Sequence, residues 1–266
     1  MKIAVIQISS ELDPEINMAK IQSLLDQVIN EDKEIKAVFL PEVFYSMSDG
    51  KNPTPYLVEG KNEHYKKIQQ LAVYNNIYLI GGTAATKIDN KIVNRAYNFS
   101  PEGELLEFYD KKHLFSVNIK SKSKSTIIDE SIVYTAGHEL KSFEFGDFKV
   151  GLTTCFDLRF PEMYRDLFKK GVNLFTVASA FTFTTGKAHW ETLVRSRAIE
   201  NQSYVIAANQ CGDHEGNAQT YGHSMIVDPW GKVIANCGEE ETYRICDIDF
   251  GLVEKIRGRM NISPRH

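Results

Sequence analysis

Short hydrophobic runs alternate with amphipathic segments along most of this 266-residue chain. The first run, Lys2–Ile8, is apolar and has the length of a buried strand. In the segment that follows, apolar residues recur every three or four positions from Met18 to Ile29, which predicts a helix with one buried face. The same two patterns predict strands at residues 37–40, 77–80, 148–154, 173–178, 204–208, 223–227 and 242–248, and helices over residues 64–74, 161–170, 187–201 and 253–259.

The middle of the chain has a different pattern. Residues 92–115 read as two strands joined by the turn Pro101–Glu104, and the polar stretch Lys120–Ser125 predicts a loop. Asp228–Gly231 is a turn sequence, because proline presets φ and glycine permits a positive one. Strands and helices alternate on both sides of this region with no linker between them. We therefore expect one domain over residues 1–266, with helices covering the faces of sheets.

Charge and hydrophobicity exclude two classes of partner. The formal net charge is −4, from 31 basic and 35 acidic side chains, so no basic excess points to nucleic acid. No hydrophobic run approaches the ~20 residues that a membrane-spanning helix needs. The first apolar run ends in polar residues without a small-residue cleavage site, which is typical of a strand and not of a signal peptide. A cytoplasmic location is therefore expected.

The four cysteines do not form a recognisable metal site or disulfide framework. No CxxC pair occurs, and Cys211 with His214 supplies only half of the ligands that structural zinc needs. In a reducing compartment the ordinary role of a cysteine is that of a small buried residue. The pair Gly81-Gly82 after a strand does not predict a dinucleotide site, because GxGxxG is absent. These patterns therefore predict neither a structural metal such as zinc nor a dinucleotide cofactor.

Three reactive side chains stand where predicted strands end. Glu42 follows residues 37–40, Lys111 closes a strand of the middle region, and Cys155 ends the strand at 148–154. Taken singly, such residues are ordinarily a solvated acid, a surface lysine and a core cysteine. Together they make chemical sense, because an ammonium lowers the pKa of a thiol and a carboxylate can accept its proton. A cysteine–histidine enzyme stays open at this point, with candidate bases at His113, His189 and His223.

Resemblance to a known family decides between these alternatives. Cys155–Glu162 (CFDLRFPE) resembles the nucleophile motif of the nitrilase, or carbon–nitrogen hydrolase, superfamily, and Leu40–Glu42 resembles its glutamate motif. Tyr109–Phe115 resembles its lysine motif, in which the catalytic lysine stands two places before a histidine; this register selects Lys111 over Lys112. The likeness covers nearly the whole chain, with the three motifs in the family's order. Further matching stretches are residues 179–181, 186–190, 195–202 and 221–224.

The resemblance implies a role for each of these residues. Glu42 would be the general base, Cys155 the nucleophile that forms a thioester, and Lys111 a donor to the oxyanion together with the backbone N–H of Phe156. The family's second glutamate is placed at Glu130, a looser match than the other three. The implied fold is an α+β four-layer α-β-β-α sandwich. Members of the family generally pair as homodimers, here through the helices near residues 159–170 and 187–201.

The residues after the cysteine point to one branch of the superfamily. They resemble the Nit branch, which includes omega-amidase and deaminated glutathione amidase, so the expected substrate is a small linear amide that carries a carboxylate. Arg159 could bind that carboxylate or brace the cysteine loop, and Phe181 and Thr182 border the implied pocket. The Lys120–Lys124 tract could attract acidic substrates. Nitrile or carbamoyl hydrolysis, and a family member that has lost turnover and acts as an interaction protein, are the alternatives.

Overall fold

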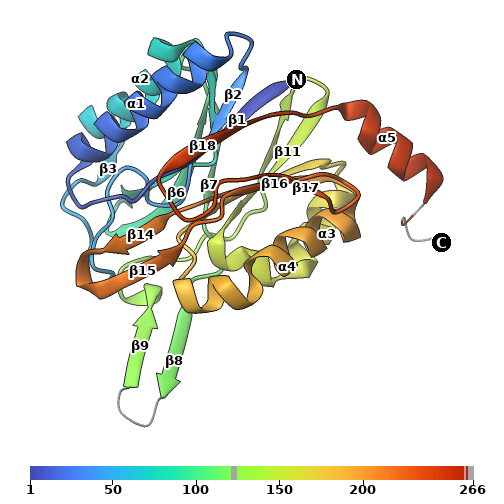
Figure 1. Cartoon of the computed structure of the whole chain (residues 1–266). Helices are drawn as coiled ribbons and strands as arrows, with labels where there is room; N and C mark the ends of the chain where they lie inside the picture. The colour runs from blue at the N-terminus through green and yellow to red at the C-terminus, as the bar shows by residue number, and fades with distance from the viewer. Residues whose placement is uncertain (121–124, 261, 263–266) are drawn as a thin grey trace.

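Two β-sheets lie face to face in the centre of the molecule, and helices cover their outer faces (Figure 1). The structure is a computed structural model that describes residues 1–120, 125–260 and 262. The helices are α1 (Pro14–Glu31), α2 (Glu63–Asn75), α3 (Pro161–Lys169), α4 (Phe183–Asn201) and α5 (Phe250–Arg259). Figure 1 places α1 and α2 on one side of the sheets, and α3 and α4 on the other. The predicted four-layer sandwich is therefore confirmed.

Each large sheet has three neighbouring parallel strands, β1–β2–β4 in the first and β11–β12–β13 in the second. The first sheet has the order β18-β1-β2-β4-β6-β5-β3, with β7 paired to β6: β1 (Lys2–Gln7), β2 (Ala37–Phe39), β3 (Val58–Glu59), β4 (Tyr78–Ile80), β5 (Thr83–Ile88), β6 (Lys91–Phe99), β7 (Leu105–Asp110) and β18 (Thr242–Asp247). The second has the order β10-β11-β12-β13-β16-β17: β10 (Ser142–Phe145), β11 (Phe148–Thr154), β12 (Leu174–Ser179), β13 (Tyr204–Asn209), β16 (Met225–Val227) and β17 (Val233–Asn236).

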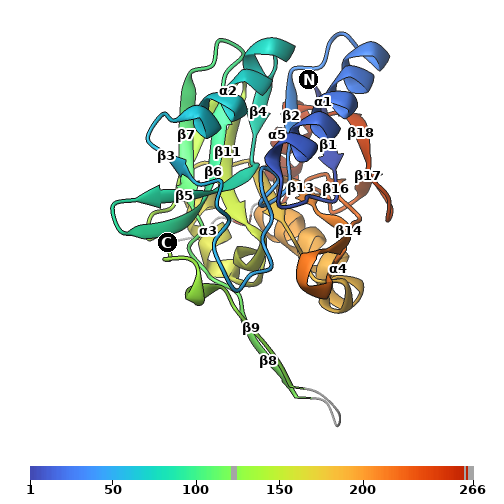
Figure 2. The same ribbon diagram turned by 90° about the vertical axis from the view of Figure 1, so that its left-hand side faces the viewer.

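Two small hairpins and three short 3-10 helices complete the described elements. The hairpins are β8 (Ser116–Lys120) with β9 (Ser125–Asp129), and β14 (Cys211–His214) with β15 (Ala218–Tyr221); the 3-10 helices are η1 (Glu130–Ile132), η2 (Cys155–Arg159) and η3 (Glu215–Asn217). Figure 2 shows the β8–β9 hairpin extending away from the body of the molecule. Lys120 of the Lys120–Lys124 tract, which was predicted to be a loop and could attract acidic substrates, ends β8, and residues 121–124 lie outside the described residues.

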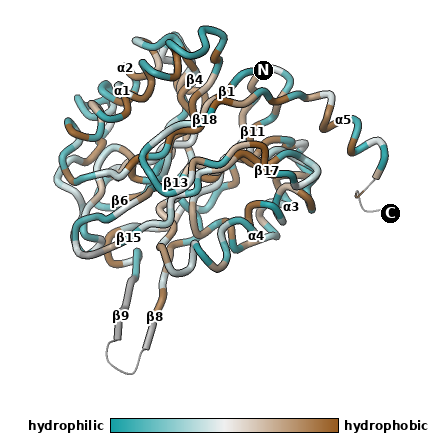
Figure 3. The backbone as a smooth tube through the Cα atoms, viewed as in Figure 1, coloured by the Kyte–Doolittle hydropathy of each residue, from teal (hydrophilic) through white to brown (hydrophobic). Residues whose placement is uncertain are grey.

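The sheets are buried on both faces, which explains the continuous apolar runs in their strands. In β1, Ile3 and Val5 belong to the core between the two sheets, whereas Ala4 and Ile6 pack in the core beneath α1 and α2. This alternation follows the two-residue period of a strand. Figure 3 shows hydrophobic residues along the central strands and on one side of the surface helices. Among the described residues, no helix combines the length and the hydrophobicity needed to cross a bilayer.

The structure corrects several predicted boundaries. Helix α4 begins at Phe183 and not at residue 187, so Thr184 and Thr185 are in its first turn. Strand β16 begins at Met225, because His223 has a φ of +53°, which no strand residue adopts. Strands β3, β5, β8, β9, β10, β14, β15 and β17 were not predicted. They are short and mix polar with apolar residues, so their pairing partners decide their conformation more than their own sequence does.

At Gly137, the loop before β10 packs closely against the end of β7, and a substitution there can test this contact. Its N–H donates to Lys111 O at 2.9 Å, and a Cβ at this position would lie 2.2 Å from Asp110 O. We expect Gly137→Ala to lower the free energy of unfolding by about 1–3 kcal/mol, because backbone must move to admit the methyl group. Gly258→Ala is the matched control, since nothing lies within 4 Å of the added Cβ. Equal urea midpoints for the two variants would contradict this.

Candidate active site

Cys155 stands at a sharp turn between a central strand and a short helix. It follows β11, the strand of the second sheet that lies between β10 and β12, and it is the first residue of η2. Its φ is +45°, a region that residues with a Cβ rarely adopt. The thiol is buried, with the residue only 8% exposed. Backbone strain of this kind typically costs ~1–3 kcal/mol, so the surroundings must hold the turn in place.

Asp157 holds this turn to the segment that carries Lys111. Its fully buried carboxylate accepts hydrogen bonds from Tyr109 Oη at 2.7 Å and from the backbone N–H of Thr154 at 2.8 Å. It also accepts bonds from the backbone N–H and the Nδ1 atom of His113, at 3.0 and 2.7 Å. Oδ2 thus binds both the lysine segment and the cysteine turn, whereas Oδ1 binds His113 of the lysine segment.

The three histidines considered as bases for Cys155 have other contacts. His113 pairs with Asp157 and stacks on Phe160 with ring centroids 3.7 Å apart. The side chain of His189 faces Arg159, and that of His223 stacks on Tyr221. Within the described residues, none of the three makes a hydrogen bond to the thiol. These contacts therefore give no support to a histidine as the base for the thiol.

The ammonium of Lys111 lies between two carboxylates in a buried site. Lys111 is fully buried, and its Nζ is 2.8 Å from Glu42 Oε1 and 2.7 Å from Glu130 Oε2. Burial by itself disfavours the charged amine, but the charges of Glu130 and then Glu42 outweigh it, so the pKa of Lys111 is raised well above its usual value. The lysine therefore remains a cation at neutral pH.

Both carboxylates are held by further hydrogen bonds. Glu42 follows β2 and accepts bonds from Asn94 Nδ2 and from the backbone N–H of Ala180, each at 2.8 Å. Glu130 begins η1 and accepts a bond from the backbone N–H of Phe115 at 2.8 Å. Burial raises the pKa of Glu130, and the ammonium of Lys111 opposes this rise. Residues from the first sheet, from the second sheet and from the end of β9 therefore all contact this cluster of charges.

Cys155 lies close enough to this cluster to share its electrostatics. Burial and then the charge of Glu42 raise the pKa of the thiol well above its usual value, while the ammonium of Lys111 acts in the opposite direction. A thiol in this environment is protonated at neutral pH and needs a base to become a nucleophile. The buried carboxylates are the groups available to accept its proton.

Aromatic rings and one cation surround the turn on the side of η2. The ring of Phe156 contacts those of Phe115 and Phe160, with centroids 5.2 and 5.5 Å apart. The guanidinium of Arg159 lies 5.9 Å from the ring of Phe156 and 5.1 Å from that of Phe181. The structure thus brings three of the four predicted substrate-side residues into one patch beside Cys155.

Thr182, the fourth predicted substrate-side residue, stands at the N-cap of α4. Its hydroxyl bonds to that of Thr185 at 2.7 Å, and its backbone forms a β-bridge with Thr220. The hydroxyl therefore already has one partner within the helix turn. Its predicted contact with substrate stays a prediction.

Several groups of the site were not predicted from the sequence. Asn94 and the N–H of Ala180 fix Glu42, and Asp157 fixes the turn of Cys155. Tyr134 is close enough to the cluster to respond to its charges. Burial raises the pKa of its phenol, and the charges of Glu130 and Glu42 raise it further. The sequence could have indicated Asn94, because it is a polar residue inside a long predicted strand, and a buried polar side chain needs a hydrogen-bond partner.

The other cysteines have different surroundings. Burial raises the pKa of Cys211 and of Cys237 to about 12 in each case, so both are unreactive thiols in the core. His214, the possible second ligand beside Cys211, contacts Ser10 O and Thr220 Oγ1. No group of three or more metal-ligating side chains occurs among the residues that the structure describes.

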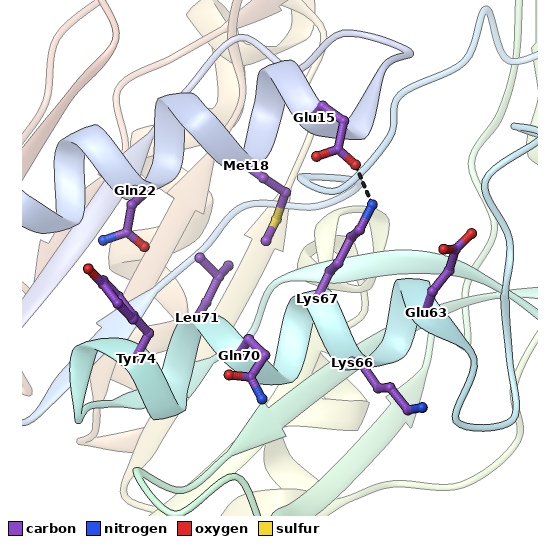
Figure 4. Close-up of a pocket in the computed structure, with 9 residues that line it drawn as sticks. All are labelled: Glu15, Met18, Gln22, Glu63, Lys66, Lys67, Gln70, Leu71 and Tyr74. Atoms are coloured by element: carbon purple, nitrogen blue, oxygen red, sulfur yellow. Dashed lines mark hydrogen bonds and ion pairs between the residues drawn. The ribbon is translucent and has the colours of Figure 1, made fainter.

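A groove of about 540 Å³ lies elsewhere, between α1 and α2 (Figure 4). Met18 and Leu71 provide its apolar part, and an ion pair between Glu15 and Lys67 bridges the two helices. All the residues that line it belong to these two helices. The groove therefore takes no part in the cluster around Cys155.

Comparison with known proteins gives a family match over most of the chain. Residues 2–258 match the family described as carbon-nitrogen hydrolase. Omega-amidase NIT2 of Xenopus tropicalis is 38% identical, covering 86% of this chain and 82% of that protein. Deaminated glutathione amidase of Dictyostelium discoideum is 36% identical, covering 96% and 90%.

Two further similarities concern a longer protein and a solved structure. The nitrilase and fragile histidine triad fusion protein NitFhit is 37% identical in Caenorhabditis elegans and 39% in Drosophila melanogaster, over 96% and 95% of this chain. The chain spans only 58% and 53% of those two proteins. The crystal structure of Saccharomyces cerevisiae Nit3, a member of branch 10 of the nitrilase superfamily, has a TM-score of 0.88 and 29% identity, covering 100% of this chain and 96% of that one.

The raised pKa of Cys155 predicts a distinctive alkylation profile. The rate of modification by iodoacetamide should stay low at neutral pH and continue to rise above pH ~8.5, where a free thiol is half ionised. Because the charge of Glu42 raises the thiol pKa, Glu42→Gln should speed alkylation at pH 7, whereas Lys111→Met should slow it further. Mass spectrometry, with Cys155→Ala to identify the adduct, measures the rates. A wild-type profile like that of free cysteine would contradict the assignment.

Proposed function

The chain belongs to the carbon–nitrogen hydrolase family, and we propose that it is an amidase that cleaves the terminal amide of a small, carboxylate-bearing compound. The observation that carries the proposal is the buried Lys111 ammonium, held between Glu42 and Glu130 beside the thiol of Cys155. The names of the amidase relatives support the same reaction class. In this proposal the thiol is the nucleophile and the product is a carboxylic acid with release of ammonia.

In the first half of the reaction, Glu42 takes the thiol proton while the sulfur of Cys155 attacks the amide carbonyl carbon. The carbonyl oxygen becomes an oxyanion, which the ammonium of Lys111 and the backbone N–H of Phe156 stabilise. Phe156 is in the first turn of η2, where N–H groups have no partner within the helix. Glu42 then gives its proton to the leaving nitrogen, the carbon–nitrogen bond breaks, and ammonia departs from an acyl-thioester.

In the second half, water attacks the thioester carbonyl while Glu42 accepts a proton from it. The second tetrahedral intermediate expels the sulfur of Cys155, which recovers its proton, and the carboxylic acid leaves. Glu130 keeps Lys111 oriented in both halves, because its carboxylate binds the same ammonium. The positions of the charges thus need not change between the two intermediates.

The substrate class is inferred from Arg159. Its guanidinium is half-buried beside Phe156 and Phe181, close enough to Cys155 that the charge of the thiolate acts on its pKa. A guanidinium binds a carboxylate in a planar, bidentate way, which suits a substrate with an acid at one end and an amide at the other. Pairing of two copies over α3 and α4 and a cytoplasmic location stay predictions.

Neighbouring lysines test the assignment of the oxyanion donor. Lys111→Ala should reduce kcat by about 10²-fold or more, because a donor to the developing oxyanion is lost together with a buried ion pair. Lys112→Ala is the matched control, since that residue makes its hydrogen bond to Tyr109 through its backbone N–H. Steady-state kinetics measures both variants, and Cys155→Ala defines the background. A Lys111→Ala enzyme with wild-type activity would sink the proposal.

Ammonia release from a panel of compounds tests the substrate class. The panel holds ω-amides of dicarboxylic acids, such as succinamate and α-ketoglutaramate, neutral amides of the same length, nitriles and carbamoyl compounds. We expect kcat/KM for the carboxylate-bearing amides to exceed that for neutral amides by about tenfold or more, the value of one well-placed charged hydrogen bond. Preferred turnover of nitriles or carbamoyl compounds would reassign the chain within the family.

A further inference from the structure

Arg159 is a half-buried cation without an acidic partner in the described part of the chain. Burial lowers the pKa of its guanidinium, and Cys155 acts to raise this pKa only when its thiol is ionised. The charged group lies against the rings of Phe156 and Phe181. A charge placed in this way normally pairs with an ion of the opposite sign. At this position, the anion can come from a ligand.

The polar contact of this guanidinium is with His189, thirty residues further along the chain. Nη1 and Nη2 of Arg159 lie 3.4 and 3.3 Å from His189 Nδ1. A guanidinium only donates hydrogen bonds, so Nδ1 is the acceptor in this contact. Nδ1 therefore faces the end of the guanidinium at which the two Nη atoms meet.

The backbone that carries His189 is firmly held. His189 is exposed on α4, but the next residue, Trp190, is fully buried. The Trp190 indole N–H donates to His223 O at 2.8 Å, and its ring packs on that of Phe181 at 5.0 Å. Phe181 in turn contacts Arg159. Phe181 thus contacts both the guanidinium of Arg159 and the indole of Trp190, the residue next to His189.

We propose that His189 is a positioning residue that sets the preference for carboxylate-bearing substrates by orienting the guanidinium of Arg159. The inference rests on the proposed function, because Arg159 is the group through which His189 acts. A guanidinium has five N–H donors, and the two that face His189 leave three, including Nε–H, for a carboxylate. Without His189, the long side chain must be ordered each time the substrate binds, and that cost appears in KM.

The test compares KM and kcat of His189 variants on a charged and a neutral substrate. In His189→Leu, KM for succinamate should rise about three- to tenfold, the cost of ordering one flexible side chain on binding. Its kcat should stay within about twofold, and KM for butyramide should be unchanged, since His189 touches neither the reacting atoms nor the amide in this proposal. His189→Gln keeps an acceptor oxygen and should restore part of the loss.

His138→Leu is the matched control, because it makes the same substitution at another exposed histidine. It should leave both KM values as in the wild type. An unchanged KM for succinamate in His189→Leu would overturn the inference. So would an equal rise for succinamate and butyramide, because that would be a general effect on the pocket and not on the carboxylate.

A binding measurement separates failure of this inference from failure of the proposed function. Succinate should protect Cys155 of the wild type from iodoacetamide, and His189→Leu should require about three- to tenfold more succinate for the same protection. Protection that is equal in the two proteins overturns the role of His189 alone. A wild type that succinate does not protect and that does not hydrolyse succinamate contradicts the proposed substrate class, and the inference falls with it.

Discussion

The burial of one ammonium between two carboxylates is the constraint on which the site depends. Lys111 is fully buried, and its charge is compatible with that burial because Glu42 and Glu130 both bind it. Breaking such a buried pair typically costs ~3–5 kcal/mol, because a charge is left without compensation. The three residues come from the ends of β2, β7 and β9, so the ion pairs also determine where these chain segments lie. The same ion pairs that hold these segments together thus also set the electrostatic potential at Cys155.

A second buried carboxylate connects the Lys111 cluster to Cys155. Asp157 binds Tyr109 and His113 on the lysine segment, and the N–H of Thr154 on the cysteine turn. The turn has a positive φ at Cys155, and the hydrogen bonds of Asp157 help to hold it. Because the lysine segment leaves the first sheet and the turn leaves the second, Asp157 also joins the two sheets. Reactivity and packing between the sheets therefore depend on the same side chains.

In the proposed function, substrate specificity depends on a different kind of contact. The charges around Lys111 are compensated, whereas Arg159 lies among aromatic rings and has the imidazole of His189 as its hydrogen-bond partner within the described residues. The compensated cluster suits a charge that appears during the reaction, and the uncompensated cation suits a charge that arrives with a ligand. The protein thus separates the two roles by the partners that it provides for each cation.

The sequence by itself determined the layers and the candidate reactive residues. Apolar runs and helical periodicity predicted the central strands and most helices. A strand buried on both faces is apolar throughout, and a helix buried on one face has apolar residues every three or four positions. The family likeness selected Glu42, Lys111, Cys155 and Glu130; the structure gathers them, and their roles stay predictions. Only the tertiary structure decided the bonds of Asn94 to Glu42, Asp157 to His113 and His189 to Arg159. These partners stand 30 to 52 residues apart along the chain, so local propensity carries no information about which of them will meet.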